Sequence, residues 1–226
     1  MMSRLLDGIA ELLCPTRCAG CDAPGVLICP SCETDLPRIQ SPTACPRCGA
    51  PHGATVCTEC WERTWSFEAC VALGNLEPPL SRAIVLAKDA NERRLAPELA
   101  SRLAGVVEAA WPGWTCQVAF VPSTTEAVRR RGFDHAAALG AGVADALGAT
   151  LVGALARTRA LDQRELSRAS RAANVAGSFA AVAPVEGRVL LVDDVMTTGA
   201  TLDACAAALL AAGAEAVRCA VLARAW

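Results

Sequence analysis

The stretch with the most chemical character runs from Arg188 to Thr201 and reads RVLLVDDVMTTGAT. It joins two adjacent acids, Asp193 and Asp194, to a turn of small residues that begins at Thr197. Backbone N–H groups in such a turn can approach a phosphate, and the positive end of a following helix favours the negative charge. Carboxylates repel phosphate, so we expect the two acids to face sugar hydroxyls or a hard cation such as Mg²⁺.

The residues around this motif predict a strand, a turn and a helix. The apolar run from Val189 to Val192 favours a parallel strand buried on both faces, with the acids standing where it ends. Leu202 to Ala212 is almost pure alanine and leucine, and Gly213 is placed to end this helix. Ligands of open α/β sheets bind beyond the carboxyl ends of the strands, so the motif predicts a site for a phosphate joined to a sugar. The alternative is that the acids only decorate a strand end and Thr201 only caps a helix.

The run VLLVDDVMTTGAT closely resembles the phosphoribosyl pyrophosphate (PRPP) signature of type I phosphoribosyltransferases. Neither a Walker A loop nor a GxGxxG dinucleotide motif occurs in the chain. The resemblance implies a PRPP-binding set consisting of Val192, Asp193, Asp194, Val195, Met196, Thr197, Thr198, Gly199, Ala200 and Thr201.

A second informative stretch holds four CxxC pairs, with intervals of 7, 12 and 8 residues between them. A CxxC pair lets two thiolates reach one metal ion, and two pairs complete a tetrahedral four-cysteine zinc site. The short intervals favour two structural Zn²⁺ sites built from neighbouring pairs, although a cross-braced arrangement also fits. A redox role or an iron–sulfur cluster matches the spacing less well. The expected ligands are Cys18, Cys21, Cys29 and Cys32 for one site and Cys45, Cys48, Cys57 and Cys60 for the other, with Cys14 spare.

Composition limits the class of protein. The 226 residues are 53% hydrophobic and 4% aromatic, with a net charge of −2, so no global basic field attracts nucleic acid. Thirteen cysteines, nine of them before residue 61, indicate metal binding in a reducing compartment. Met1 to Leu13 carries Asp7 and Glu11, which does not suit a signal peptide, and no membrane span is evident. We therefore expect a cytoplasmic protein.

The pattern of elements predicts an α/β fold with a mostly parallel sheet. Expected strands are Cys70–Leu73, Gln117–Val121, Thr150–Ala156, Val189–Val192 and Ala216–Ala223, and expected helices are Leu80–Lys88, Pro97–Ala110, Phe133–Leu147 and Leu202–Ala212. The composition change divides the chain into a small cysteine-rich, metal-binding module over residues 11–66 and an α/β domain over residues 67–226.

Three further segments carry polar chemistry. Pro122 and Ser123 follow a predicted strand, which places them at the ligand edge of the sheet or in an ordinary loop. Arg129 to Arg131 suits a polyphosphate through bidentate contacts, although adjacent arginines are more often a solvated face. The polar segment from Arg157 to Asn174, which contains Arg168, could close over the site as a lid.

Taken together, RRRGFDHA, DQRELSRASRAANVAGSF, the signature and the final VLAR resemble the ComF family, which includes competence protein F. That family pairs an N-terminal double zinc ribbon with a type I phosphoribosyltransferase domain, and Lys88 in IVLAKDA resembles its lysine after the first helix. The chain departs from the family at Asp134-His135 and at Ser123-Thr124.

The resemblance implies a reaction of PRPP with an acceptor that the sequence does not name. The turn would hold the 5′-phosphate, and Asp193 and Asp194 would hold the ribose hydroxyls, directly or through Mg²⁺. Pyrophosphate would lie against the loop at Pro122 and Ser123 and against positive groups among Lys88, Arg131 and Arg168. His135 is a candidate base or a structural residue.

A second hypothesis is a PRPP-sensing protein that binds single-stranded DNA or competence-machinery proteins, although the chain has no Tyr and four Phe for base stacking.

Overall fold

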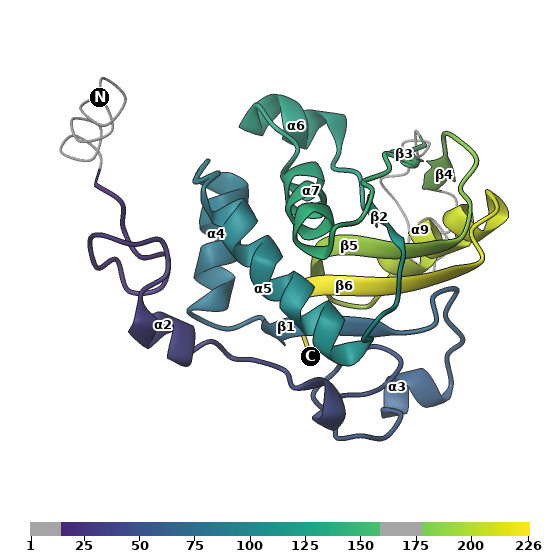
Figure 1. Cartoon of the computed structure of the whole chain (residues 1–226), viewed down its shortest axis with the longest axis horizontal. Coiled ribbons are helices and arrows are strands. Elements are labelled where there is room, and N and C mark those ends of the chain that lie inside the picture. Colours follow the sequence, from purple (N-terminus) through teal and green to yellow (C-terminus); the bar gives the residue numbers. More distant parts are fainter. Residues whose placement is uncertain (1–14, 159–177) are drawn as a thin grey trace, which may run out of the picture.

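The computed structural model describes residues 15–158 and 178–226 (Figure 1). A four-stranded sheet of order β1-β6-β5-β2 lies at its centre, and each neighbouring pair of strands is parallel. Its strands are β1 (Cys70–Asn75), β2 (Gln117–Phe120), β5 (Arg188–Met196) and β6 (Ala216–Arg224). The predicted α/β fold with a parallel sheet is confirmed.

Helices cover both faces of the sheet (Figure 1). The helices α4 (Leu80–Asp89), α5 (Leu95–Ala110) and α7 (His135–Leu147) lie on one face, and α9 (Ala200–Ala211) lies on the other. Because side chains alternate along a strand, Leu190 and Val192 pack towards α5 and α7, whereas Val189 and Leu191 pack towards α9. The same alternation sets the direction in which the side chains of Asp193 and Asp194 leave β5.

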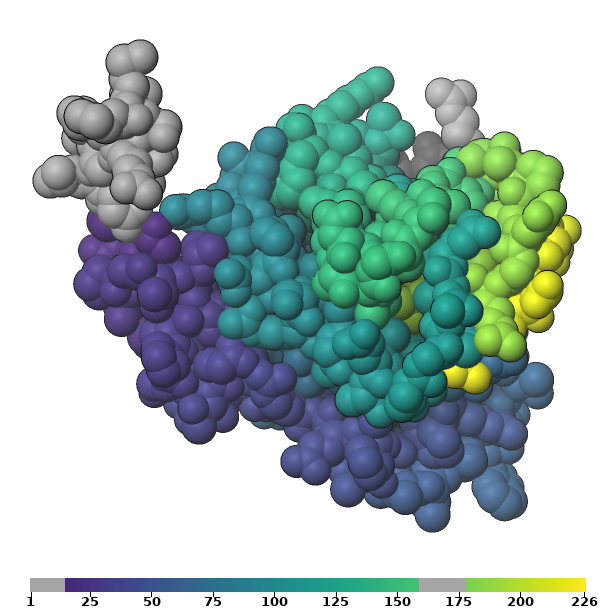
Figure 2. Space-filling model, viewed as in Figure 1, coloured from purple at the N-terminus to yellow at the C-terminus, as the bar shows by residue number. Residues whose placement is uncertain are grey.

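The cysteine-rich segment wraps around the edge of this core, as the purple and blue surface in Figure 2 shows. It contains the short helices α2 (Pro30–Thr34), η1 (Ser41–Thr43) and α3 (Thr58–Trp61). Between its two cysteine groups the chain pairs with the free edge of β1: Ile39 N–H donates to the Leu73 carbonyl over 3.1 Å, and Asn75 N–H donates to the Pro37 carbonyl over 2.8 Å. The segment is thereby joined to the sheet by backbone hydrogen bonds.

The prediction of one strand over Thr150–Ala156 is wrong. Leu151 forms a single parallel bridge to Val118, and the chain then leaves the sheet at Gly153. The following residues form a separate antiparallel pair, β3 (Leu155–Arg157) with β4 (Phe179–Ala181). Glycine weakens a strand interior because it has no side chain to pack, which is the physical reason for the break.

The region before α7 also differs from the prediction. A helix that the sequence analysis did not identify, α6 (Thr125–Arg131), begins at the Thr124 cap and ends at Gly132, whose φ is +75°. The next helix begins at His135 rather than at Phe133, because the Asp134 carboxylate accepts hydrogen bonds from two backbone N–H groups of its first turn.

Some predicted features lie outside the described residues: the segment Met1–Leu13, the spare Cys14, and most of the polar segment with Arg168. Within the described ranges, each helix is too short or too polar to cross a membrane.

Candidate functional site

A cavity of about 250 Å³ opens at the carboxyl ends of β2 and β5. Strand β5 continues two residues beyond the acids to Met196, so Asp193 and Asp194 lie inside the strand rather than after it. The residues that follow β2 form the opposite wall. Seven of the residues predicted for the site line this cavity, namely Lys88, Pro122, Ser123, Arg131, Asp193, Asp194 and Thr201.

Asp194 is the centre of the site. It continues the register of Leu190 and Val192, which directs its side chain to the face covered by α4 and α7. There its Oδ2 accepts hydrogen bonds from Lys88 Nζ, at the end of α4, and from His135 Nε2, at the start of α7, over 3.0 Å in the second case. Only 7% of Asp194 is exposed. Burial opposes ionisation, but the His135 hydrogen bond and the Lys88 charge outweigh it and hold the pKa of Asp194 well below its usual range.

Both ring nitrogens of His135 have partners. Arg131 NH1 and Ser123 Oγ each lie 3.2 Å from its Nδ1. The ionised Asp194 carboxylate can only accept, so Nε2 carries a proton and donates a hydrogen bond to Asp194. Arg131 is itself held by Asp89, with 3.0 Å between Nε and Oδ1. A chain of contacts thus runs from Asp89 through the arginine and the imidazole to the acid.

Asp193 has a different environment although it is the adjacent residue. Its side chain is half-buried, and its Oδ1 accepts a hydrogen bond from the backbone N–H of Asp194 over 2.9 Å. Burial and the negative charge of Asp194 raise the pKa of Asp193 to about 8. The pair therefore holds one firmly ionised carboxylate beside one that keeps its proton near neutral pH. A cation bound beside Asp193 would draw this proton off.

The signature turn, residues 197–201, leads from β5 into α9. Gly199 has a φ of +75°, and a Cβ added there would lie 2.6 Å from Met196 Cε and 2.8 Å from the Trp65 ring. Only glycine fits this position. Thr197 and Thr198 are exposed, and Thr201, in the first turn of α9, faces the cavity.

A buried arginine supports the signature turn through hydrogen bonds to backbone carbonyls. Arg224, at the end of β6, is 2% exposed and donates through NH1 to the carbonyls of Met196, over 3.2 Å, and of Thr197. Its NH2 lies 3.4 Å from Glu59 Oε2. The sequence analysis treated this arginine only as part of the final VLAR. The signal was a charged residue directly after the apolar run from Cys219 to Ala223.

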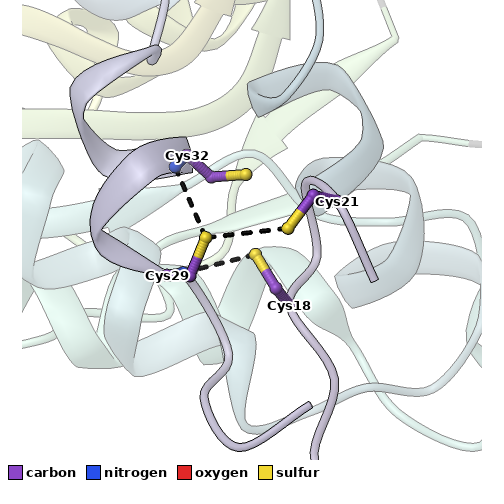
Figure 3. Close-up of side chains that lie close together, drawn as sticks. All are labelled: Cys18, Cys21, Cys29 and Cys32. Atoms are coloured by element: carbon purple, nitrogen blue, oxygen red, sulfur yellow. Dashed lines mark hydrogen bonds between the residues drawn. The ribbon is translucent and has the colours of Figure 1, made fainter. Parts of the chain in front are cut away.

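The eight CxxC cysteines form two groups in sequence order, within each of which the sulfur atoms all lie within 4.8 Å of one another. In the first cysteine group (Cys18, Cys21, Cys29 and Cys32) the four side chains point towards a common centre (Figure 3). Burial raises the pKa of Cys18, but hydrogen bonds from backbone N–H groups outweigh it and lower the pKa to about 6. The second cysteine group (Cys45, Cys48, Cys57 and Cys60) is fully buried.

Both groups fit a tetrahedral metal ion. Zinc–sulfur bonds of about 2.3 Å place tetrahedral sulfur ligands roughly 3.8 Å apart. The measured Sγ···Sγ separations of 3.6 Å, between Cys21 and Cys29 and between Cys48 and Cys57, are close to this value. Each group supplies four thiols and so leaves no open coordination position, which is the pattern of a structural site.

Comparisons with known proteins show the family of this chain. The family model described as "Phosphoribosyl transferase domain" matches residues 135–225, which include α7, the acids and the signature turn. DNA utilization protein YhgH of Salmonella typhimurium is 30% identical over 220 residues, which cover 92% of this chain and 96% of that protein. The chain belongs to the YhgH family of phosphoribosyl transferase domain proteins.

YhgH of Escherichia coli is a further relative, 32% identical over 78% of this chain and 82% of its own length. Among solved structures, the glutamine PRPP amidotransferase from B. subtilis in complex with ADP and GMP is 27% identical with a TM-score of 0.39. The similarity covers 56% of this chain and 25% of the amidotransferase. This YhgH-family chain therefore corresponds to about a quarter of the amidotransferase.

Most of the remaining predicted residues of this YhgH-family protein lie around the cavity rather than in its lining. Val192 and Met196 are buried in the core. Arg129 and Arg130 are exposed on α6, whereas Arg157, from the predicted lid, lines the cavity and donates to the Pro122 carbonyl over 3.1 Å. His135 also lines the cavity, where the sequence analysis had it as a candidate base or a structural residue, and Thr124 is a lining residue that the sequence analysis did not place in the site.

Proposed function

We propose that this protein is a PRPP-dependent phosphoribosyltransferase of the ComF family. The observation that carries the proposal is the convergence on Asp194 of Lys88 and His135 beside the signature turn. These groups come from three separated parts of the chain, and all three line the cavity. The family match to a phosphoribosyl transferase domain supports this interpretation.

The 5′-phosphate would bind on the turn 197–201, where backbone N–H groups at the start of the twelve-residue helix α9 are available. The ribose hydroxyls would lie against Asp193 and Asp194. These two acids would also hold Mg²⁺, which neutralises charge on the pyrophosphate when bound. Three cations line the same cavity, Lys88, Arg131 and Arg157, and they suit the pyrophosphate of PRPP.

In the transfer step the bond between the ribose C1 and the pyrophosphate oxygen breaks, and pyrophosphate leaves with the electron pair. A nucleophilic atom of the acceptor forms the new bond to C1 and releases its proton. The protein would contribute by holding the ribose in place and by stabilising the charge that develops on pyrophosphate. His135 donates a hydrogen bond from Nε2–H to Asp194, so its role would be to keep that carboxylate ionised and oriented.

Two measurements in the presence of Mg²⁺ test the proposal: pyrophosphate release from PRPP with water in place of the unidentified acceptor, and PRPP binding by calorimetry. The variant Arg131→Met removes a cation from the cavity and should weaken PRPP binding at least tenfold. The matched variant Arg129→Met removes an exposed arginine of the same helix and should leave binding unchanged. Equal effects of the two variants would contradict the assignment of the pyrophosphate side.

The zinc-ribbon assignment is part of the same proposal: residues 11–66 would form a module with two structural Zn²⁺ sites, and residues 67–226 would form the transferase domain. The fit of both sulfur groups to a tetrahedral ion supports this division. Metal analysis of the purified protein should find two zinc ions per chain.

A second candidate function rests on the relatives named DNA utilization protein. The same fold could sense PRPP while binding single-stranded DNA or proteins of the competence machinery, with the exposed Arg129 and Arg130 as contacts. Such DNA binding would weaken steeply with salt because phosphate contacts release counterions. If a single-stranded oligonucleotide does not bind at low salt, or if its affinity does not change with salt, the second candidate function is contradicted.

A further inference from the structure

The chain that leaves the second cysteine group lies directly against the signature turn. Trp65 Nε1–H donates to Cys60 Sγ over 3.2 Å, while the far edge of the same indole ring fills the space next to Gly199. Arg63 stacks on this ring, with its Cζ 4.1 Å from the ring centroid, and donates from NH1 to the Thr198 carbonyl over 3.1 Å. One short segment therefore contacts both a cysteine sulfur and the turn.

Two more contacts extend this connection to either side. The backbone N–H of Ser66 donates to Asp203 Oδ1 over 2.6 Å, in the first turn of α9. Glu59, the residue before Cys60, forms the ion pair with Arg224 that faces the Met196 and Thr197 carbonyls. The backbone before the turn, the turn itself and the helix after it are thus each connected to residues 59–66.

Arg47 links residues 59–66 to the second cysteine group. It lies inside the first CxxC pair of the group, and its NH1 donates to the Cys60 carbonyl over 2.9 Å and to the Arg63 carbonyl over 3.4 Å. A metal ion held by the four thiolates would fix Cys60 and the loop that carries Arg47. Residues 59–66 would then have one position rather than several.

We infer that the second cysteine group is a positioning device for the signature turn, acting through Arg63 and Trp65. When the metal is bound, the indole and the guanidinium hold Thr198 and Gly199 in the conformation in which the backbone faces a 5′-phosphate. Loss of the metal releases Cys60, then Trp65, and the turn loses that support. The part of this inference that concerns the ligand rests on the proposed function, whereas the coupling between metal and turn does not.

The first cysteine group provides an internal control. It is fixed to the core by Arg82 of α4, whose NH1 donates to the Gly20 carbonyl over 2.7 Å and whose NH2 lies 3.5 Å from Asp22 Oδ1. This arginine resembles Arg63 in linking a cysteine group to the α/β core, but it lies on α4, whereas Arg63 lies in the loop after α3, and its contacts given above do not include a residue of the turn. The variants Arg63→Ala and Arg82→Ala are therefore a matched pair.

The experiment measures amide hydrogen exchange of residues 197–203 in the zinc-loaded full chain, together with PRPP affinity in the presence of Mg²⁺. In Arg63→Ala, the loss of a charged hydrogen bond should speed exchange in the turn and weaken PRPP binding by about fivefold or more. Trp65→Phe, which keeps a ring but removes the N–H donor to Cys60, should have the same direction of effect. Arg82→Ala should match the wild type, and metal analysis should find two zinc ions in all four proteins.

The outcomes separate this inference from the proposed function. Unchanged exchange in both Arg63→Ala and Trp65→Phe, with both zinc ions retained, overturns the coupling even if the wild type binds PRPP. Faster exchange in these two variants, in a protein whose wild type does not bind PRPP, supports the coupling and rejects the proposed ligand. An equal change in Arg82→Ala would show a general loss of stability and would also overturn the inference.

Discussion

Replacement of Gly199 by alanine combines two separate destabilising effects. Its φ of +75° places an L-residue in the left-handed region, which costs about 1–2 kcal/mol. The added Cβ would also lie 2.6 Å from Met196 Cε and 2.8 Å from the Trp65 ring. The Met196 methyl group can move, but the indole is held by its hydrogen bond to Cys60 and its stacking on Phe67, with centroids 5.0 Å apart. Overpacking of this kind costs about 1–3 kcal/mol, so the two effects together amount to about 2–5 kcal/mol.

Urea denaturation of Gly199→Ala against Gly113→Ala measures the two effects separately. Gly113 has a φ of +69°, but an added Cβ there meets no atom within 4 Å, so Gly113→Ala should lose only the backbone contribution of about 1–2 kcal/mol. The free energy of unfolding of Gly199→Ala should fall further, with an unchanged denaturant slope. Similar losses in the two variants would refute the close packing of Trp65 against the turn.

Three other predictions concern the acids and the metal. In the folded protein Asp193 keeps its proton up to about pH 8, whereas in the unfolded chain it releases the proton near pH 4. Asp193 should therefore make the free energy of unfolding fall as the pH rises between these two values. In a pH series of denaturation curves, Asp193→Asn should flatten that fall. His135→Ala removes a donor from Asp194 and should weaken Mg²⁺-dependent PRPP binding about tenfold by calorimetry, whereas His52→Ala, in the cysteine-rich segment, should have no effect. Removal of zinc by a chelator should lower the melting temperature, because the second cysteine group belongs to a hydrophobic core cluster. An unchanged melting curve after complete removal of zinc would contradict a structural role for the metal.

The sequence was most informative where chemistry and local structure coincide. The run from Val189 to Thr201 identified a strand, a turn and a helix in the correct order, because a buried parallel strand and an alanine-rich helix both have strong local patterns. The alternation along β5 would also have indicated that the two acids point to opposite faces, had the strand been extended past Val192. Its true end at Met196 depends on pairing with Arg224 of β6, which is a non-local contact.

The partners of the acids could not be predicted from local patterns. Lys88 and His135 lie 106 and 59 residues before Asp194 in the sequence, and they meet it only because α4 and α7 pack on the same face of the sheet. A single histidine next to an arginine run has no local signal that separates a site residue from a structural one. The support of the turn by Arg63 and Trp65 is similarly hidden, since it arises where the cysteine-rich segment packs against the end of the sheet.

The measurement that tests the central claim most directly is isothermal titration of PRPP with Mg²⁺ into the zinc-loaded protein, with the double variant Asp193→Ala plus Asp194→Ala alongside. We predict saturable binding of one PRPP per chain by the wild type and its loss in the double variant, which should keep its zinc and its fold. Equal binding by both proteins would contradict the role of the two acids. Absence of binding in both would contradict the claim that this cavity is a PRPP site.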